Sequence, residues 1–467
     1  MGKGGSVSDY RRIADRIADD IASGRLRPGQ QLPPQRVFAR RHGIAGSTAG
    51  RVYAELVRRG LVVGEVGRGT FVRAAAAGPY GQALIEAPTE ATSPTPAPVN
   101  LELNYPSAPG QSELLAPALA PLLRPDVLTE ALRPAPANGT AAAREVAADL
   151  LATPGWRPDP GRVLFAGNAR QAIAATLASL VRPGGRVGVE PLTYPLVKQI
   201  AARLGITLVA LEADGEGPRP ESVAAAHRTA PLSALYLQPT LHNPTSVTTS
   251  ESRRVEIARV VRELGLPVVE DRIWSFLHPH SPAPLAAHAP GLVHVVDGLS
   301  KRVAPGLTVG FLVVPEQRVD AVAAAIRSGG WSAGRFALEA GTRWTADGTV
   351  ARLVAAKRAD AAGRQRLVAE ELAGFAVRSD PLTYYAWWEL PAPWRADTFT
   401  AAAAALGIAV TPGPAFVVDP NRTPDAVRLG LASAAVPDLT RALRMLAGLA
   451  RGGGAGAGTP LPGGRTG

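Results

Sequence analysis

The strongest constraint on the fold is an alternation, through the middle of the chain, between short runs rich in Val and Leu and longer alanine-rich stretches. Such short apolar runs are typical of strands buried on both faces, and the stretches between them have the composition of helices. Strands that are separated by helices pair in parallel. The sequence therefore predicts an α/β fold with a mostly parallel sheet and helices on both faces. The predicted strands are 163–165, 186–189, 208–211, 234–237, 267–269 and 292–296.

Four of these runs are followed by a side chain that could react with a ligand or bind one. These residues are Lys301, Asp271, Asn243 and Tyr194. A lysine amine can form a Schiff base with an aldehyde, and a buried carboxylate can keep a pyridine nitrogen protonated. An amide can donate to a phenolic oxygen, and an aromatic ring can stack on another ring. Ligands of parallel sheets bind outside the carboxyl ends of the strands. Each residue alone is more typical of a surface or a turn, but the set in this order favours a ligand site.

The first 73 residues hold most of the charge. They contain 14 Lys and Arg against 6 Asp and Glu, whereas the rest has 36 against 33, in a chain of net charge +11. A small basic part on a nearly neutral remainder indicates a polyanionic partner, because cationic side chains that neutralise phosphates release counterions. A solvated arginine-rich surface is the alternative.

Three helical patterns lie within residues 8–59. In the first, Ser8 is the expected N-cap of a stripe of apolar positions, and the second ends at Gly43. The third starts with Ser47 or Thr48 as N-cap, and its apolar stripe consists of Val52, Tyr53, Leu56 and Val57. Two short helices across a tight turn predict a helix-turn-helix.

Two β-prone runs, 61–63 and 70–72, flank a glycine-rich tip that contains Arg68. This pattern predicts a hairpin, which would be the wing of a winged helix. The segments 32–36, 53–56 and 67–72 together resemble the N-terminal domain of GntR-family regulators.

This resemblance implies that the third helix enters the major groove of double-stranded DNA, with Ser47, Thr48 and Arg51 near bases or phosphates. It further implies that three other arginines contact the DNA backbone or the minor groove. These are Arg36, Arg40 and Arg68.

Residues 100–450 resemble the fold-type-I aminotransferases, which bind pyridoxal 5′-phosphate. The resemblance implies that Lys301 forms the Schiff base and that Asp271 pairs with the pyridine nitrogen. Asn243 would donate to the phenolic oxygen, and Tyr194 would stack on the ring. The turn 167–172, with Ala169 and Arg170 at the start of a helix, matches the phosphate-binding turn. Ser300 and Arg302 flank the lysine, and Arg428 matches the arginine that holds a substrate carboxylate.

Two positions depart from the family pattern. Trp274 stands where a tyrosine usually reaches the phenolic oxygen, and an indole can only donate. Thr308 stands where an arginine commonly binds the phosphate. We expect Arg302 or Arg170 to compensate.

Composition narrows the remaining possibilities. Without cysteine there is no disulfide framework or thiolate site, and the seven histidines have no metal-ligand spacing. No segment approaches the roughly 20 apolar residues that span a bilayer, so a cytoplasmic protein is expected.

The combined pattern resembles the MocR subfamily of GntR regulators. We expect a winged helix-turn-helix over 8–73, a linker over 74–99, a body over 100–450 and a disordered tail over 451–467. The resemblance implies a homodimeric transcription regulator that responds to pyridoxal phosphate or its amine adduct. A working aminotransferase and a cofactor-free repressor with a scaffold domain remain the alternatives.

Overall fold

The structure is a computed structural model, and it describes residues 6–22, 25–26, 30–59, 61–65, 69–72 and 99–452. We call residues 6–72 the head and residues 99–452 the body. The predicted linker, apart from Val99, and the predicted tail from residue 453 onward lie outside the described residues, as does Arg68.

A seven-stranded sheet forms the centre of the body, with the strand order β5-β13-β12-β11-β10-β6-β7. Four neighbouring pairs, from β12 through β7, are parallel, and only β13 runs antiparallel to its neighbours β12 and β5. The prediction of a mostly parallel sheet is therefore confirmed. The strands are β5 Val163–Ala166, β6 Arg186–Val189, β7 Thr207–Ala210, β10 Ala234–Leu237, β11 Val268–Asp271, β12 Val293–Gly298 and β13 Gly310–Val313.

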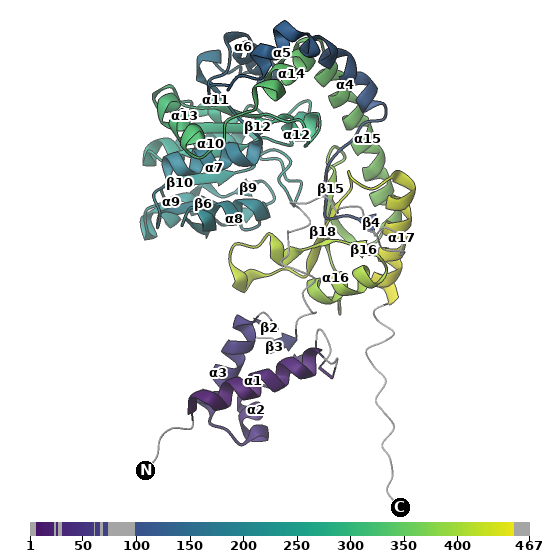
Figure 1. Cartoon of the computed structure of the whole chain (residues 1–467). Coiled ribbons are helices and arrows are strands. Elements are labelled where there is room, and N and C mark those ends of the chain that lie inside the picture. The colour runs from purple at the N-terminus through teal and green to yellow at the C-terminus, as the bar shows by residue number, and fades with distance from the viewer. Residues whose placement is uncertain are drawn as a thin grey trace, which may run out of the picture.

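Helices cover both faces of this sheet, which explains why its strands are apolar almost throughout. One face packs against α7 Ala169–Leu180, α8 Pro195–Arg203 and α13 Val319–Ser328. The other face packs against α6 Ala141–Leu151, α9 Pro220–Thr229, α10 Glu251–Leu264, α11 Leu285–His288 and α14 Arg335–Ala346. Figure 1 shows the two layers around the sheet.

A smaller antiparallel sheet, with the order β14-β15-β18-β17, packs against two helices to form a second core. Its elements are β14 Ala376–Ser379, β15 Tyr385–Glu389, β17 Thr411–Pro412, β18 Ala426–Gly430, α16 Ala396–Ala405 and α17 Val436–Gly452. The long helix α15, Thr349–Glu371, contributes Leu353 to the first core and Val368 to the second. It therefore joins the two parts of the body (Figure 1).

The head contains three helices and a three-stranded sheet of order β1-β3-β2. The elements are α1 Ser6–Ala22, β1 Gln31–Leu32, α2 Gln35–His42, α3 Gly46–Arg58, β2 Val62–Glu65 and β3 Gly69–Val72. In its core Phe38 and Tyr53 meet edge to face with ring centroids 5.2 Å apart. The predicted helix-turn-helix and hairpin are both present.

Some local predictions in the head are wrong. Ser8 lies inside α1, and the N-cap of α3 is Ala45 rather than Ser47 or Thr48. The carbonyl of Ala45 already accepts hydrogen bonds from Thr48 N and Ala49 N, so the first turn starts earlier. Val57 is 48% exposed and does not belong to the buried stripe.

Gly43 does end α2, in the left-handed conformation that favours glycine. No helix among the described residues is both long and apolar enough to cross a membrane.

Candidate functional site

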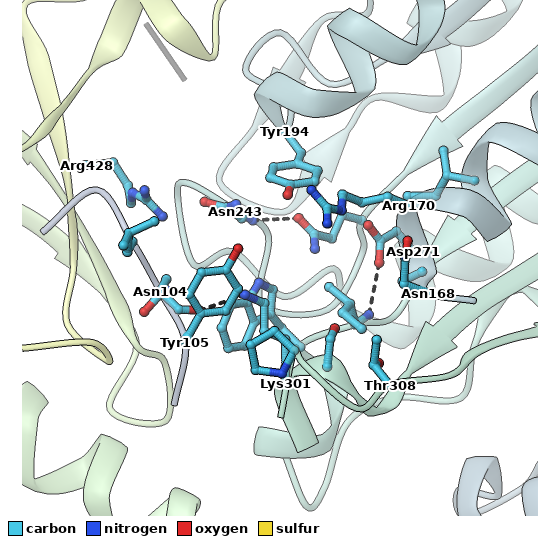
Figure 2. A pocket seen from close by; sticks show the side chains of 18 residues that line it. Asn104, Tyr105, Asn168, Arg170, Tyr194, Asn243, Asp271, Lys301, Thr308 and Arg428 are labelled. Carbon is cyan, nitrogen blue, oxygen red and sulfur yellow. Dashed lines mark hydrogen bonds between the residues drawn. The ribbon is translucent and has the colours of Figure 1, made fainter. Parts of the chain in front are cut away.

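A pocket of about 870 Å³, open at its mouth, lies at the carboxyl ends of the parallel strands, between the large sheet and β18 (Figure 2). Nine of the predicted ligand residues line it, namely Ala169, Arg170, Tyr194, Asn243, Asp271, Trp274, Ser300, Lys301 and Arg428. Residues that follow different strands therefore meet at one edge of the sheet, as the parallel topology requires.

Lys301 lies in the short helix α12, Leu299–Arg302, which directly follows β12. Its Nζ atom donates to the main-chain oxygen of Asn104 at 2.7 Å and lies 4.1 Å from the ring centroid of Tyr105. Removal from bulk water, together with the charges of Arg428 and Arg170, lowers the pKa of Lys301 to about 7. A substantial fraction of the amine is thus uncharged near neutral pH, and only the uncharged amine is nucleophilic.

A second lysine fixes the turn that carries Lys301. Lys357, fully buried on α15, donates to the main-chain oxygens of Lys301 at 3.1 Å and Val303 at 2.7 Å. The Tyr384 hydroxyl in turn donates to the main-chain oxygen of Lys357. The position of the amine therefore depends on the helix that joins the two sheets.

Asp271, at the end of β11, presents a buried carboxyl group to the pocket. Its Oδ2 accepts from the Tyr236 hydroxyl at 2.6 Å, and its Oδ1 accepts from Ile273 N at 2.9 Å. Burial nevertheless raises the pKa of Asp271 to about 6. A cationic N–H group placed against this carboxyl would stabilise the charged form and lower the pKa again.

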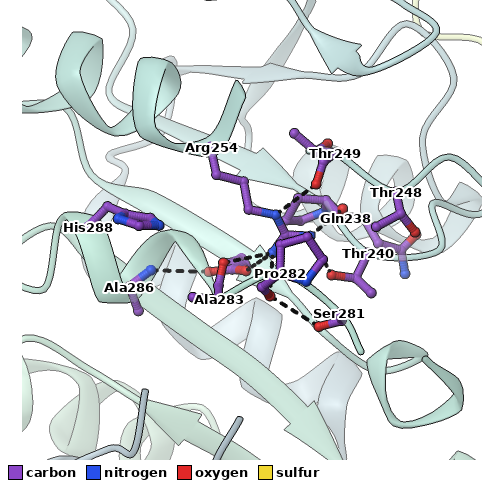
Figure 3. A network of polar contacts seen from close by, with 12 residues as sticks. Gln238, Thr240, Thr248, Thr249, Arg254, Ser281, Pro282, Ala283, Ala286 and His288 are labelled. Carbon is purple, nitrogen blue, oxygen red and sulfur yellow. Dashed lines mark hydrogen bonds and ion pairs between the residues drawn. The ribbon is translucent and has the colours of Figure 1, made fainter. Parts of the chain in front are cut away.

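Asn243 lies in the loop between β10 and α10, where its main-chain N donates to Gln238 Oε1 at 2.8 Å. The loop is fixed by hydrogen bonds from Arg254, whose side chain is fully buried (Figure 3). Arg254 donates to the main-chain oxygens of Thr249 at 3.0 Å and Pro239 at 2.8 Å. It thereby ties the two ends of the segment that presents Asn243.

The N-terminus of α7 forms another wall of the pocket. Asn168 caps the helix by accepting from Gln171 N at 3.0 Å, and Ala169 and Arg170 begin it. Gly310 on β13 passes so close that a Cβ atom there would lie 2.9 Å from Ala169 N and closer still to the Asn168 carbonyl. Free main-chain N–H groups and the helix dipole favour an anion at such a terminus.

Polar atoms in the pocket fit a phosphorylated pyridine aldehyde. Among the described residues, four buried atoms of its lining have no hydrogen-bond partner: Thr308 Oγ1, Asn243 Oδ1, Asn104 Nδ2 and Arg428 Nε. Such orphaned atoms are costly unless a ligand or water satisfies them. With the amine of Lys301 and the carboxyl of Asp271, they give the pocket donors and acceptors suited to pyridoxal phosphate.

Arg428, on β18, supplies a buried cation on the far side of the pocket. It donates to the main-chain oxygen of Glu102 at 2.5 Å and to Thr411 Oγ1 at 2.9 Å, while its Nε has no partner among the described residues. Burial lowers the pKa of Arg428 to about 10, so it remains charged at neutral pH. It can therefore receive a carboxylate.

Arg302 does not take the predicted place. Its guanidinium pairs with Asp297 at 2.5 Å and lies 5.2 Å from the ring centroid of Phe276, and it does not line the pocket. The expectation that Arg302 takes part in the site is therefore corrected; of the two arginines expected to compensate, only Arg170 lines the pocket. Trp274, in contrast, does line the pocket, with its ring centroid 5.1 Å from Lys301 Nζ.

Leu103, Asn104 and Tyr105 also line the pocket, and sequence reasoning missed them. They lie in an extended segment before the first helix of the body and follow no predicted strand. No local signal could have found them, because their contacts join residues about 200 positions apart.

In the head, the predicted DNA-contacting residues that the structure describes are exposed or half-buried. Ser47 and Arg51 are exposed on α3, and Thr48 is half-buried. Arg36 and Arg40 are exposed on the preceding helix. Their contacts with DNA stay a prediction.

Comparison with known proteins places both parts of the chain. The model of aminotransferase class I and II matches residues 129–446, which is more than half of the chain. The chain belongs to this family. The model of bacterial regulatory proteins of the gntR family matches residues 9–72, so a GntR helix-turn-helix precedes the aminotransferase-type body.

Relatives with the same arrangement are regulators by name. An uncharacterized HTH-type transcriptional regulator of Bacillus subtilis, YdeF, is 29% identical over 90% of this chain and 90% of its own length. The HTH-type transcriptional regulator TauR of Rhodobacter capsulatus is 26% identical over 69% and 71%. This arrangement is consistent with the MocR subfamily.

Among solved structures, the α-aminoadipate aminotransferase LysN of Thermus thermophilus superposes with a TM-score of 0.69 at 22% identity. The match covers 76% of this chain and 92% of LysN. The aminotransferase fold of the body is thereby shown.

Proposed function

We propose that this aminotransferase-family protein is a transcription regulator whose head binds double-stranded DNA and whose body binds pyridoxal phosphate, or its adduct with an amine, as an effector. One observation carries the proposal. In a chain that begins with a GntR helix-turn-helix, Lys301 presents an amine of lowered pKa to a pocket that also contains Asp271, Asn243 and Tyr194.

When bound, pyridoxal phosphate supplies an aldehyde for condensation with amines and a ring that acts as an electron sink. Lys301 holds the nucleophilic nitrogen, and the Asp271 carboxylate would hold a proton on the pyridine nitrogen. Tyr194 offers its ring for stacking, and Asn243 offers its side-chain amide to the phenolic oxygen. Ala169, Arg170, Ser300 and Thr308 line the pocket and would hold the phosphate, and Arg428 would receive the carboxylate of an amino compound.

Regulation would follow from linkage between the two parts. A ligand that binds one arrangement of a homodimer more tightly shifts the population toward it, and with it the spacing of the two DNA-binding heads. The DNA-binding residues we propose are Ser47, Thr48 and Arg51 on α3. Arg36, Arg40 and Arg68 would contact the DNA backbone or the minor groove.

The test is a binding assay of the full chain against DNA upstream of its own gene, with and without pyridoxal phosphate, at two salt concentrations. We expect affinity to fall with salt and to change with the cofactor. The visible absorbance of bound cofactor should disappear in Lys301→Ala. If wild type develops no such absorbance, the body is a cofactor-free scaffold and the sensing part of the proposal fails.

A working aminotransferase is the second candidate, because Lys301, Asp271 and Arg428 together retain the groups that transamination uses. In that case Lys301 would also carry the substrate α-proton. Turnover of an amino acid with an oxo-acid acceptor at ordinary enzymatic rates would favour this candidate. Adduct formation without turnover would favour the regulator.

A further inference from the structure

Asn104 belongs to none of the motifs predicted from the sequence. Its side chain is 6% exposed and lines the pocket together with Arg428 and Lys301 (Figure 2). The orientation of its amide is determined by one contact, since Oδ1 accepts from Ala432 N at 3.1 Å. The other end of the amide is therefore the NH₂ group, and its Nδ2 atom is buried without a hydrogen-bond partner among the described residues.

Main-chain oxygens next to Asn104 accept hydrogen bonds from the two cationic side chains of the pocket, Lys301 and Arg428. The main-chain oxygen of Asn104 itself accepts from Lys301 Nζ at 2.7 Å, and the oxygen of Glu102 accepts from Arg428 Nη2 at 2.5 Å. The segment 102–105 thus lies between the amine and the guanidinium. A small ligand that contacts both cations would therefore lie next to this segment.

The segment 102–105 packs closely against β18. A Cβ atom on Gly430 would lie 2.6 Å from the oxygen of Leu103 and 2.9 Å from that of Leu101. Asn100 holds the near end, because its Oδ1 accepts from Glu102 N at 2.9 Å and from Leu103 N at 3.0 Å. Asn104 is therefore presented by a fitted backbone, which reduces the entropy lost when it binds a ligand.

We propose that Asn104 is a further ligand-binding residue, whose side-chain NH₂ donates to the carboxylate of an amino-acid adduct held by Arg428. This inference rests on the proposed function and adds the group that distinguishes an amino carboxylic acid from a simple amine. An orphaned amide N–H beside a buried cation gains most from an anionic acceptor. Asn104 also accepts from Lys301 Nζ through its main-chain oxygen, so the residue lies next to the amine as well.

The test uses the full chain and two stable probes that cannot condense with Lys301. N-(5′-phosphopyridoxyl)-L-alanine carries the carboxylate, and N-(5′-phosphopyridoxyl)ethylamine lacks only that group. Calorimetry gives the Kd of each probe, and the ratio of the two values isolates the contribution of the carboxylate.

Asn104→Asp is the sharpest variant, because it keeps the acceptor for Ala432 N and replaces the donor by an anionic oxygen that repels the carboxylate of the alanine probe. We expect this variant to raise the Kd of the alanine probe roughly tenfold or more and the Kd of the ethylamine probe by less than about twofold. Asn104→Ala, measured in the same way, should lower the ratio in the same direction and covers the case in which the aspartate variant does not fold. Asn138→Ala, at an exposed asparagine of the body that does not line the pocket, is the control and should leave the Kd of both probes unchanged.

An unchanged ratio in the Asn104 variants would overturn the inference and leave the proposed function intact. Equal losses for both probes would do the same, since they would mark a structural role only. If wild-type protein binds neither probe, the proposed function fails as well.

Discussion

Replacing Lys301 by methionine should make the ligand-free body more stable at neutral pH. The lysine has an ordinary pKa of 10.5 and a pKa of about 7 in the folded protein. Linkage then gives a cost of at most about 4 kcal/mol at pH 7 for keeping this group in the fold. Losing the hydrogen bond to Asn104 offsets about 1 kcal/mol, so we expect a net gain of roughly 2–3 kcal/mol.

The gain should depend on pH in a defined direction. Between the two pKa values the unfolded chain binds more protons than the folded chain, so wild-type stability rises with pH in this window. The methionine variant lacks this contribution. Its advantage should therefore shrink as the pH rises, and at pH 9.5 the remaining cost of the lysine is only about 1.4 kcal/mol.

Urea unfolding followed by tryptophan fluorescence is a suitable assay, because all seven tryptophans lie between residues 156 and 394. The signal therefore reports the body and not the head. Midpoints of wild type and Lys301→Met are compared at pH 7 and pH 9.5. A variant midpoint equal to or below that of wild type at pH 7 would refute the reasoning, and so would a gain that is undiminished at pH 9.5.

Three further predictions concern the cofactor and DNA. Gly310→Ala should weaken pyridoxal phosphate binding in equilibrium dialysis, because the new Cβ pushes β13 away from the start of α7, whereas Gly291→Ala, with open space around it, should not. Wild-type affinity for the cofactor should fall below about pH 6, where Asp271 becomes neutral. Asp271→Asn should bind weakly and lack this part of the fall, so that only the pH dependence of the Lys301 amine remains. Arg51→Ala should weaken DNA binding and reduce the slope of log affinity against log salt by about 1 if Arg51 contacts a phosphate.

Much of the body could be predicted because its signals are local. Buried parallel strands are short apolar runs, and parallel topology brings the residues after them to one edge. Asp271, Asn243 and Tyr194 each follow a different strand, and the structure gathers them in one pocket with Lys301. The antiparallel strand β13 was missed, since its direction depends on pairing with β5 and β12.

Other features depend on tertiary packing and had no local signal. Arg302 is adjacent to Lys301 in sequence, yet Asp297 draws its guanidinium away from the pocket. Lys357 supports the lysine turn from a helix more than 50 residues further on, and Asn104 contacts it from about 200 residues earlier. The predicted N-cap of α3, Ser47 or Thr48, was wrong for a local reason. The helix begins after Ala45, which caps it without a side-chain hydrogen bond.

The path of residues 99–105 has a practical consequence for dissecting this protein. β4, Val99–Asn100, pairs with β16, Ile408–Ala409, and the chain then runs directly along the pocket wall. A shortened protein that starts at Pro106, with the first 105 residues removed to study the body alone, would lose part of its ligand cavity with them. Deletions meant to separate the two activities should therefore end before Val99, and loss of ligand binding after a longer cut would not show that the head takes part in it.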